Sequence, residues 1–167
     1  MTTEIAKYLT ELLVSLHLSK EFIVMFLAGF PIMEVRGGMI VASLLGMDPY
    51  LSLLLCIIGN LIPIPFLVYL LKPVFKWMRK WKPFEKVVTK LEEKAYKKKD
   101  KIEKYQFLGI LLLVAIPLPG TGAWTGCLVA SVFDVPKKIS ITACSLGVLS
   151  ASLIMWVFSF GVLGSIL

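Results

Sequence analysis

The stretch FPIMEVRGG, residues 30–38, decides how the first half of this chain folds. It interrupts an apolar sequence with a proline, two glycines, a carboxylate at Glu34 and a guanidinium at Arg36. The 167-residue chain is 57% hydrophobic, with a mean hydropathy of +0.83, which is more apolar surface than one soluble core needs. We therefore predict an all-α integral membrane protein in which this stretch breaks a membrane-embedded segment.

The chain consists of two related halves. A shift of 88 residues aligns Pro31 with Pro119 and the tripeptide at 41–43 with the one at 129–131. The other matches are Gly38 with Gly126, Ser52 with Ser140, Cys56 with Cys144 and Gly59 with Gly147. These eight identities over residues 31–59 indicate an internal duplication.

Each half contains a broken apolar segment followed by a longer apolar run. The pieces beside the breaks are shorter than the roughly 20 residues that a helix needs to cross a bilayer. The predicted domains are repeat 1 at 21–71 (re-entrant hairpin 22–47, span 50–71) and repeat 2 at 106–167 (re-entrant hairpin 107–133, span 139–160).

The broken segments could also be kinked helices that pass through the membrane. The loop after the second one contains Lys137 and Lys138, whereas the equivalent loop at 46–49 has no basic residue. Re-entrant hairpins place the basic loop on the cytoplasmic side, as the positive-inside rule prefers. Hairpin-plus-span halves insert in opposite orientations, so the sequence predicts an inverted repeat, an arrangement associated with transporters.

The segment between the repeats, residues 72–105, is strongly basic. Residues 72–104 hold 13 Lys and Arg against 5 Asp and Glu, within a chain of net charge +7. Apolar residues recur at helical spacing from residue 84 to 105, which predicts an amphipathic cytoplasmic linker helix that binds anionic lipid headgroups or pairs across a dimer. Nucleic-acid binding is the weaker interpretation, because no binding motif accompanies the charge. Residues 1–20 are predicted to form an amino-terminal interfacial helix.

Two breaks supply the candidate substrate- or ion-binding residues. The first offers Glu34, Arg36, Gly37 and Gly38, and the following span adds Asn60. Ionisable residues at membrane depth usually mark a substrate or ion path, although Glu34 and Arg36 could also form a purely structural ion pair. The second break offers backbone N–H groups and hydroxyls from Gly120, Thr121, Gly122, Trp124, Thr125 and Gly126; tight helix packing is the alternative role for its glycines.

The three cysteines, Cys56, Cys127 and Cys144, lie in apolar runs without metal-ligand spacing. They are interpreted as small buried side chains. We expect no metal and no cofactor, and no enzymatic activity, because the apolar regions lack a paired carboxylate or an activated nucleophile.

The two break motifs, PIMEVRGG at 31–38 and PLPGTGAWTG at 117–126, resemble those of the small multidrug export protein family, distant relatives of the DedA (VTT-domain) superfamily. The resemblance covers nearly the whole chain. It implies paired re-entrant hairpins and movement of lipids, notably undecaprenyl phosphate in bacteria, coupled to protons. Glu34 matches the superfamily's acidic position, whereas the arginines of its second hairpin are missing here.

These observations predict a membrane transporter or lipid flippase for polyprenyl phosphate or another small amphiphile. It would work by alternating access, with Glu34 coupling to protons or cations. A homodimer in the plasma membrane of a prokaryote is expected, because two spans give little protein to shield polar tips from lipid. The alternative is a non-transporting membrane scaffold whose basic linker binds anionic lipids or a partner.

Overall fold

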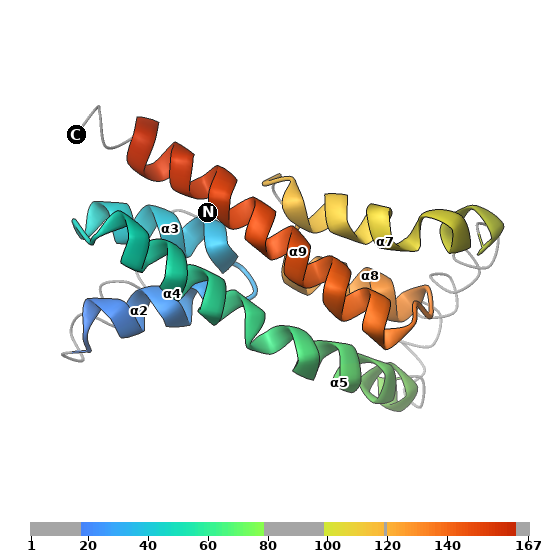
Figure 1. Ribbon diagram of the computed structural model, residues 1–167. Coiled ribbons are helices and arrows are strands. Elements are labelled where there is room, and N and C mark those ends of the chain that lie inside the picture. The colour runs from blue at the N-terminus through green and yellow to red at the C-terminus, as the bar shows by residue number, and fades with distance from the viewer. Residues whose placement is uncertain (1–17, 79–98, 119, 163–167) are drawn as a thin grey trace. The chain divides into compact units, whose positions relative to one another are not determined.

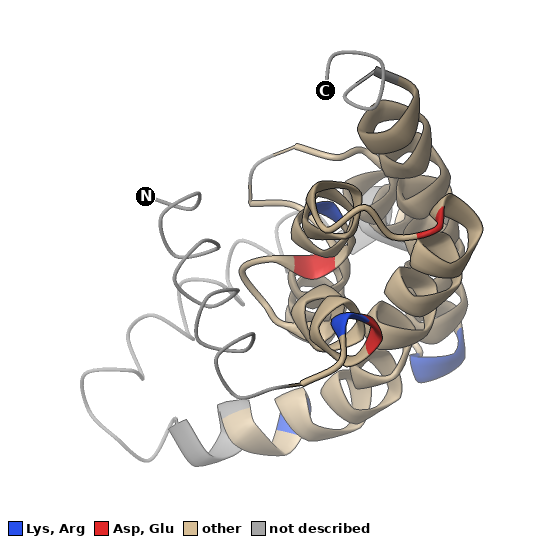
Figure 2. Ribbon diagram, turned by 90° about the vertical axis from the view of Figure 1, so that its left-hand side faces the viewer, with Lys and Arg blue, Asp and Glu red and all other residues tan. Residues whose placement is uncertain are grey.

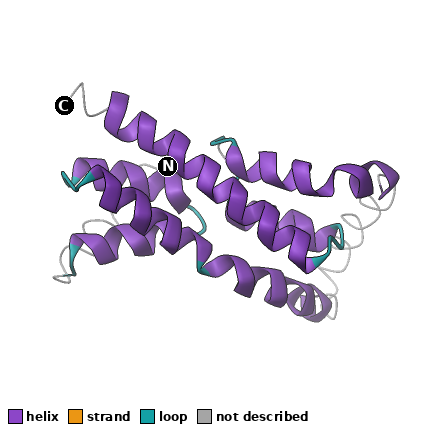
Figure 3. Ribbon diagram, viewed as in Figure 1, coloured by secondary structure: helices purple, strands orange, loops and turns teal. Residues whose placement is uncertain are grey.

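The computed structural model describes residues 18–78, 99–118 and 120–162, and the described elements are helices joined by short loops (Figures 1 and 3). The chain divides into two compact units. Unit 1 comprises Met1–Pro63 and Val148–Leu167, and unit 2 comprises Ile64–Gly147. Most of the predicted amino-terminal helix at 1–20, and the linker from residue 79 to 98, lie outside the described residues.

Unit 1 is built on α2 (Lys20–Gly29), α3 (Glu34–Leu44) and α4 (Pro49–Leu61), which pack against one another (Figure 1). The Ser19 hydroxyl caps α2 by accepting the N–H of Phe22, and the Asp48 carboxylate caps α4 by accepting the N–H of Leu51 at 2.8 Å. Such caps satisfy backbone donors that have no partner inside the helix.

Helices α2 and α3 form a hairpin whose turn is the sequence break. The turn closes with backbone bonds from the N–H groups of Met33 and Glu34 to the carbonyl of Phe30. At the other end, Lys20 at the start of α2 donates to the carbonyl of Leu45 just beyond α3, at 3.1 Å. The chain therefore leaves and returns to the same end, as a helical hairpin requires.

Unit 2 contains most of α5 (Pro63–Met78), then α7 (Lys99–Ala115), α8 (Ala123–Val132) and the first half of α9 (Lys137–Trp156). Helices α7 and α8 pack against each other on either side of the second break. We expected the linker helix to end at residue 105 and the second hairpin to begin at residue 107. At this junction α7 is interrupted by a kink, because Tyr105 has non-helical dihedral angles, φ −124° and ψ 16°.

Within the described residues, two helices are long and apolar enough to cross a membrane, Pro49–Val74 and Lys137–Gly161. They coincide with the predicted spans at 50–71 and 139–160. The first has its α4–α5 junction at Ile62, immediately before Pro63, since proline cannot donate the backbone hydrogen bond of a helix interior. The second ends as the π-helix η1 (Val157–Val162). Together with the composition, these helices and the helical structure of the described residues indicate a membrane protein.

Small residues bring the helices together in the same way in both halves. A Cβ atom at Gly38 would lie 2.9 Å from Ala28 Cβ and 3.1 Å from Cys56 Sγ. At the equivalent Gly126, an added Cβ would collide with Val114 and lie 3.2 Å from Cys144 Sγ. Each glycine thus admits a neighbouring helix that a larger side chain would exclude.

The loops after α3 and α8 also share one geometry. The N–H groups of Gly46 and Met47 bond to the carbonyls of Ser43 and Ala42, and those of Asp134 and Val135 bond to Ser131 and Ala130. This is a Schellman motif, which ends a helix with one left-handed residue. That residue is Gly46 (φ 61°) in the first half and Asp134 (φ 52°) in the second. The duplication read from sequence therefore extends to individual backbone hydrogen bonds.

Candidate binding site at the first break

Glu34 is the first residue of α3, and its side chain is buried, with 6% of its surface exposed. Its backbone has φ 49°, a left-handed conformation that costs a residue with a Cβ atom roughly 1–2 kcal/mol. The repeat offset places Gly122 at the equivalent position, where φ is 136°. The second half uses a glycine where the backbone turns, and the first half keeps a carboxylate there despite the strain. Strained residues of this kind cluster at functional sites.

The packing of α3 against α4 brings Glu34 and Asn60 to the same level. The two helices run antiparallel through a short loop, and Gly38 meets Cys56 where they cross. One helical turn before Gly38 is Glu34, and one turn after Cys56 is Asn60, so both fall on the facing sides of their helices. Both side chains are buried.

Asn60 is 2% exposed, and its Oδ1 atom is buried without a hydrogen-bond partner in the part of the chain that the structure describes. Leaving a buried acceptor unsatisfied costs about 1–3 kcal/mol. The neighbouring Gly59 explains why α4 comes so close at this level, because a Cβ there would collide with the carbonyl oxygen of Met25 in α2. The Asn60 amide oxygen therefore lies in closely packed surroundings and accepts no hydrogen bond from the described residues.

The other predicted residues of the first break have different environments. Arg36 is half-buried, and its charge interacts with that of Glu34. Gly37 lies against Met33, where an added Cβ would be 2.8 Å from Met33 Cβ, and Gly38 is a packing residue of α3. Glu34, Arg36 and Asn60 all belong to unit 1, where Gly38 lies at the contact with α2 and α4 and Gly37 lies against the preceding turn.

The threonine hydroxyls of the second break form hydrogen bonds within their own loop. The Thr121 hydroxyl donates to the carbonyls of Ile116 and Leu118 at 2.9 and 2.8 Å, and the Thr125 hydroxyl donates to Gly120 at 3.1 Å. Gly120 (φ 80°) and Gly122 supply the left-handed turns. Trp124 is half-buried, and Gly126 packs against α7 and α9 as described above. This break belongs to unit 2, so its predicted role as the wall opposite Glu34 stays a prediction.

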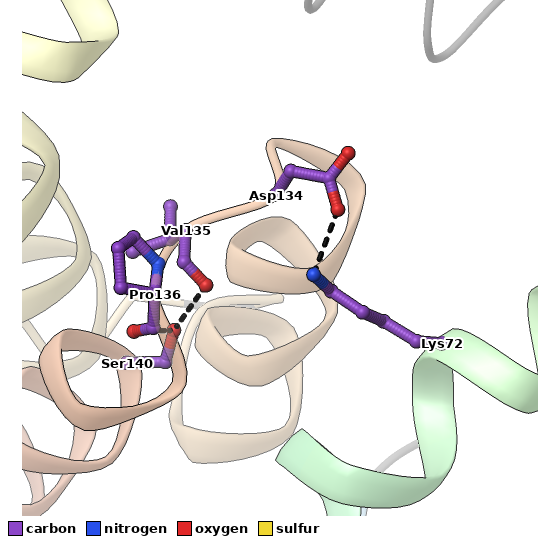
Figure 4. A network of polar contacts seen from close by, with 5 residues as sticks. All are labelled: Lys72, Asp134, Val135, Pro136 and Ser140. Carbon is purple, nitrogen blue, oxygen red and sulfur yellow. Dashed lines mark hydrogen bonds and ion pairs between the residues drawn. The ribbon is translucent and has the colours of Figure 1, made fainter.

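Charged groups are sparse along the described helices (Figure 2). In unit 2, Lys72 near the end of α5 pairs with Asp134 in the α8–α9 loop, with Nζ and Oδ1 2.8 Å apart (Figure 4). Lys137 lies 4.2 Å from the centre of the Tyr69 ring, a cation–π contact between the same two regions. Among the described residues, no group of three or more His, Cys, Asp or Glu is placed to hold a metal ion. The three cysteines are buried.

Sequence reasoning missed a second buried polar cluster at the far end of α3. The Ser43 hydroxyl donates to the carbonyl of Ser159 in η1 at 3.0 Å, and the Ser159 hydroxyl oxygen is buried without a partner among the described residues. Trp156 Nε1 donates to the carbonyl of Pro49 at 2.9 Å beside the Tyr50 ring. Ser159 lies in an apolar run near the carboxy terminus, and no sequence motif around it indicated a buried polar contact.

The comparisons with known proteins add one finding. The family model described as "Putative small multi-drug export protein" matches residues 34–154, a range that includes Glu34 and the rest of the first break to Gly38, the whole second break and Asn60. No curated protein and no solved structure matches the chain.

Proposed function

Because the chain belongs to the family of small multi-drug export proteins, we propose that it moves a small amphiphilic substrate across the membrane by alternating access, with Glu34 binding a proton or cation. One observation carries this proposal. A buried carboxylate in a strained left-handed backbone begins a short helix inside an apolar unit. A charge in such an environment is energetically costly, and ionisable residues at membrane depth usually mark a substrate or ion path.

Contacts within each unit support re-entrant hairpins and an inverted repeat. In unit 1, the Lys20–Leu45 contact returns α3 to the end where α2 starts. In unit 2, the ion pair between Lys72 and Asp134 holds the α8–α9 loop beside the end of α5, where the basic linker begins. A broken segment that passed straight through the bilayer would put that loop on the opposite face from the linker. The prediction of a cytoplasmic linker rests on its basic composition and the positive-inside rule.

Labelling can test this topology directly. We expect Leu44→Cys and Lys138→Cys, both at exposed positions, to react with an impermeant maleimide from opposite faces of the membrane, with Lys138→Cys on the cytoplasmic face. The three native cysteines are buried, so they should react slowly with the maleimide and add little background labelling. Labelling of both positions from one face would contradict the inverted repeat.

Transport is tested in proteoliposomes with a fluorescent cationic amphiphile and with a labelled polyprenyl phosphate, each with and without a pH gradient. We expect Glu34→Gln to abolish movement of the transported substrate while the protein stays folded. The matched control is Glu21→Gln, because Glu21 is an exposed carboxylate in the first turn of α2. Unchanged flux in Glu34→Gln would contradict the proposal. Flux of the polyprenyl phosphate alone would assign a lipid flippase.

The scaffold alternative makes the opposite prediction. If the hairpins only shape the fold, neither substrate moves in wild type, and function follows the linker lysines that bind anionic lipid. The homodimer belongs to the proposal as well, and crosslinking in native membranes tests it.

A further inference from the structure

Glu34 and Asn60 present acceptors at one level of unit 1. Glu34 contributes a carboxylate, and Asn60 contributes an amide oxygen that is buried and accepts no hydrogen bond from the residues that the structure describes. An acceptor of this kind is stabilised by a ligand that brings an N–H or O–H group. A phosphate group, which is rich in acceptors, would leave Asn60 Oδ1 unsatisfied.

We infer that Glu34 and Asn60 together bind a protonated amine. Glu34 supplies the negative charge, and Asn60 Oδ1 accepts one N–H. This inference rests on the proposed function, because it identifies the cationic headgroup of the substrate as the group that enters the site. It also identifies Asn60 as the residue that distinguishes amines with N–H groups from quaternary ammonium ions, which have none.

The duplication explains why the site occurs once. The positions equivalent to Glu34 and Asn60 are Gly122 and Val148, neither of which carries a polar side chain. The surrounding small-residue packing recurs at Gly126 and Cys144, so the scaffold alone does not require an amide at position 60. The second half forms the same packing arrangement with Val148 at the equivalent position, so this packing does not depend on Asn60.

The experiment measures binding rather than transport. The full-length protein in phosphatidylcholine nanodiscs is titrated calorimetrically with hexylammonium and with hexyltrimethylammonium, which share a charge and a chain but differ in N–H donors. Because the two cations differ in hydration, the informative quantity is the ratio of their dissociation constants compared across variants. A hydrogen bond from a charged donor corresponds to about tenfold or more in affinity, so Asn60→Leu should reduce the preference for hexylammonium by about that factor.

Two controls keep the result interpretable. Asn60→Leu removes the unsatisfied buried oxygen, and retained affinity for hexyltrimethylammonium shows an intact site. Ser159→Ala removes the other unsatisfied buried oxygen of unit 1, at the opposite end of α3, and should leave the ratio unchanged. Glu34→Gln should weaken both cations.

The inference is overturned if hexylammonium does not bind, if the ratio is the same in wild type and Asn60→Leu, or if hexyl phosphate binds more tightly than either cation. Its failure is distinguishable from that of the proposed function. Flux in proteoliposomes without any N–H preference would retain the transporter and remove the amine site. Amine binding that depends on Asn60, without flux, would retain the site and remove the transporter.

Discussion

The two halves of this protein share a scaffold and differ in chemistry. Both place a glycine against a cysteine between helices, and both end the following helix with a Schellman motif. At the break itself, the first half places a strained, buried Glu34, whereas the second has Gly122 and threonine hydroxyls that bond to their own loop. We infer from this comparison that the features shared by both halves build the fold, whereas the features found in only one half locate the candidate site.

The largest effect on stability is expected at the glycines of the scaffold. A Cβ at Gly59 would collide with the backbone carbonyl of Met25, whereas one at Gly147 would lie 2.6 Å from Val114 Cβ, which is a less severe overlap. We expect Gly59→Ala to lower the free energy of unfolding by about 1–3 kcal/mol, and Gly147→Ala by less. Thermal denaturation in detergent measures both.

Gly109 provides the matched control for these variants. It lies in α7, and a Cβ there would meet nothing within 4 Å. Gly109→Ala should be neutral or stabilising, since alanine favours a helix by up to about 1 kcal/mol over glycine. Equal losses at all three positions would mean that close packing does not distinguish them.

Sequence reasoning succeeded where residue type dictates geometry. The repeat offset, the breaks at Pro31 and Pro117 and both spans follow from proline, glycine and apolar run length, and the helices lie where these rules place them. It could not find the strain at Glu34, because a positive φ on a residue with a Cβ atom is imposed by packing. Nor could it place Glu34 and Asn60 at one level, because they are 26 positions apart and only the register of α3 on α4 relates them. The boundary that it drew between the linker helix and the second hairpin lies at the kink of α7, at Tyr105.

Replacing Glu34 by the residue of the other half separates strain from charge. Glu34→Gly relieves the left-handed conformation and removes a buried carboxylate, whereas Glu34→Gln removes the charge and retains the strain. We expect Glu34→Gly to be more stable than Glu34→Gln by about 1 kcal/mol, while both lose amine binding. Denaturant or thermal unfolding compares them. Equal stabilities would indicate that the backbone at position 34 is not strained in the membrane.

The left-handed loop residues offer a similar comparison at a smaller scale. Gly46 has φ 61° and open space around its Cβ position, so Gly46→Ala meets a conformational penalty and no collision. We expect a loss of about 1 kcal/mol, measured by thermal unfolding. Gly46→Asn should lose less, because asparagine tolerates this conformation. If alanine and asparagine behaved alike, the Schellman geometry would not limit the stability of this loop.

The smallest effect is expected where the second half carries its own unrepeated charge. Asp134 occupies the left-handed position equivalent to Gly46 and pairs with Lys72, but its side chain is 81% exposed and that of Lys72 is 40% exposed. Exposed ion pairs contribute about 0–1 kcal/mol, so Asp134→Asn, which keeps a residue that tolerates the backbone, should change the free energy of unfolding by less than about 0.5 kcal/mol. Lys72→Met should match it, and the double variant should equal either single one if the pair is their main interaction. A loss above about 2 kcal/mol from either would mean that this contact is shielded from solvent and holds the α8–α9 loop against α5 as firmly as buried packing does.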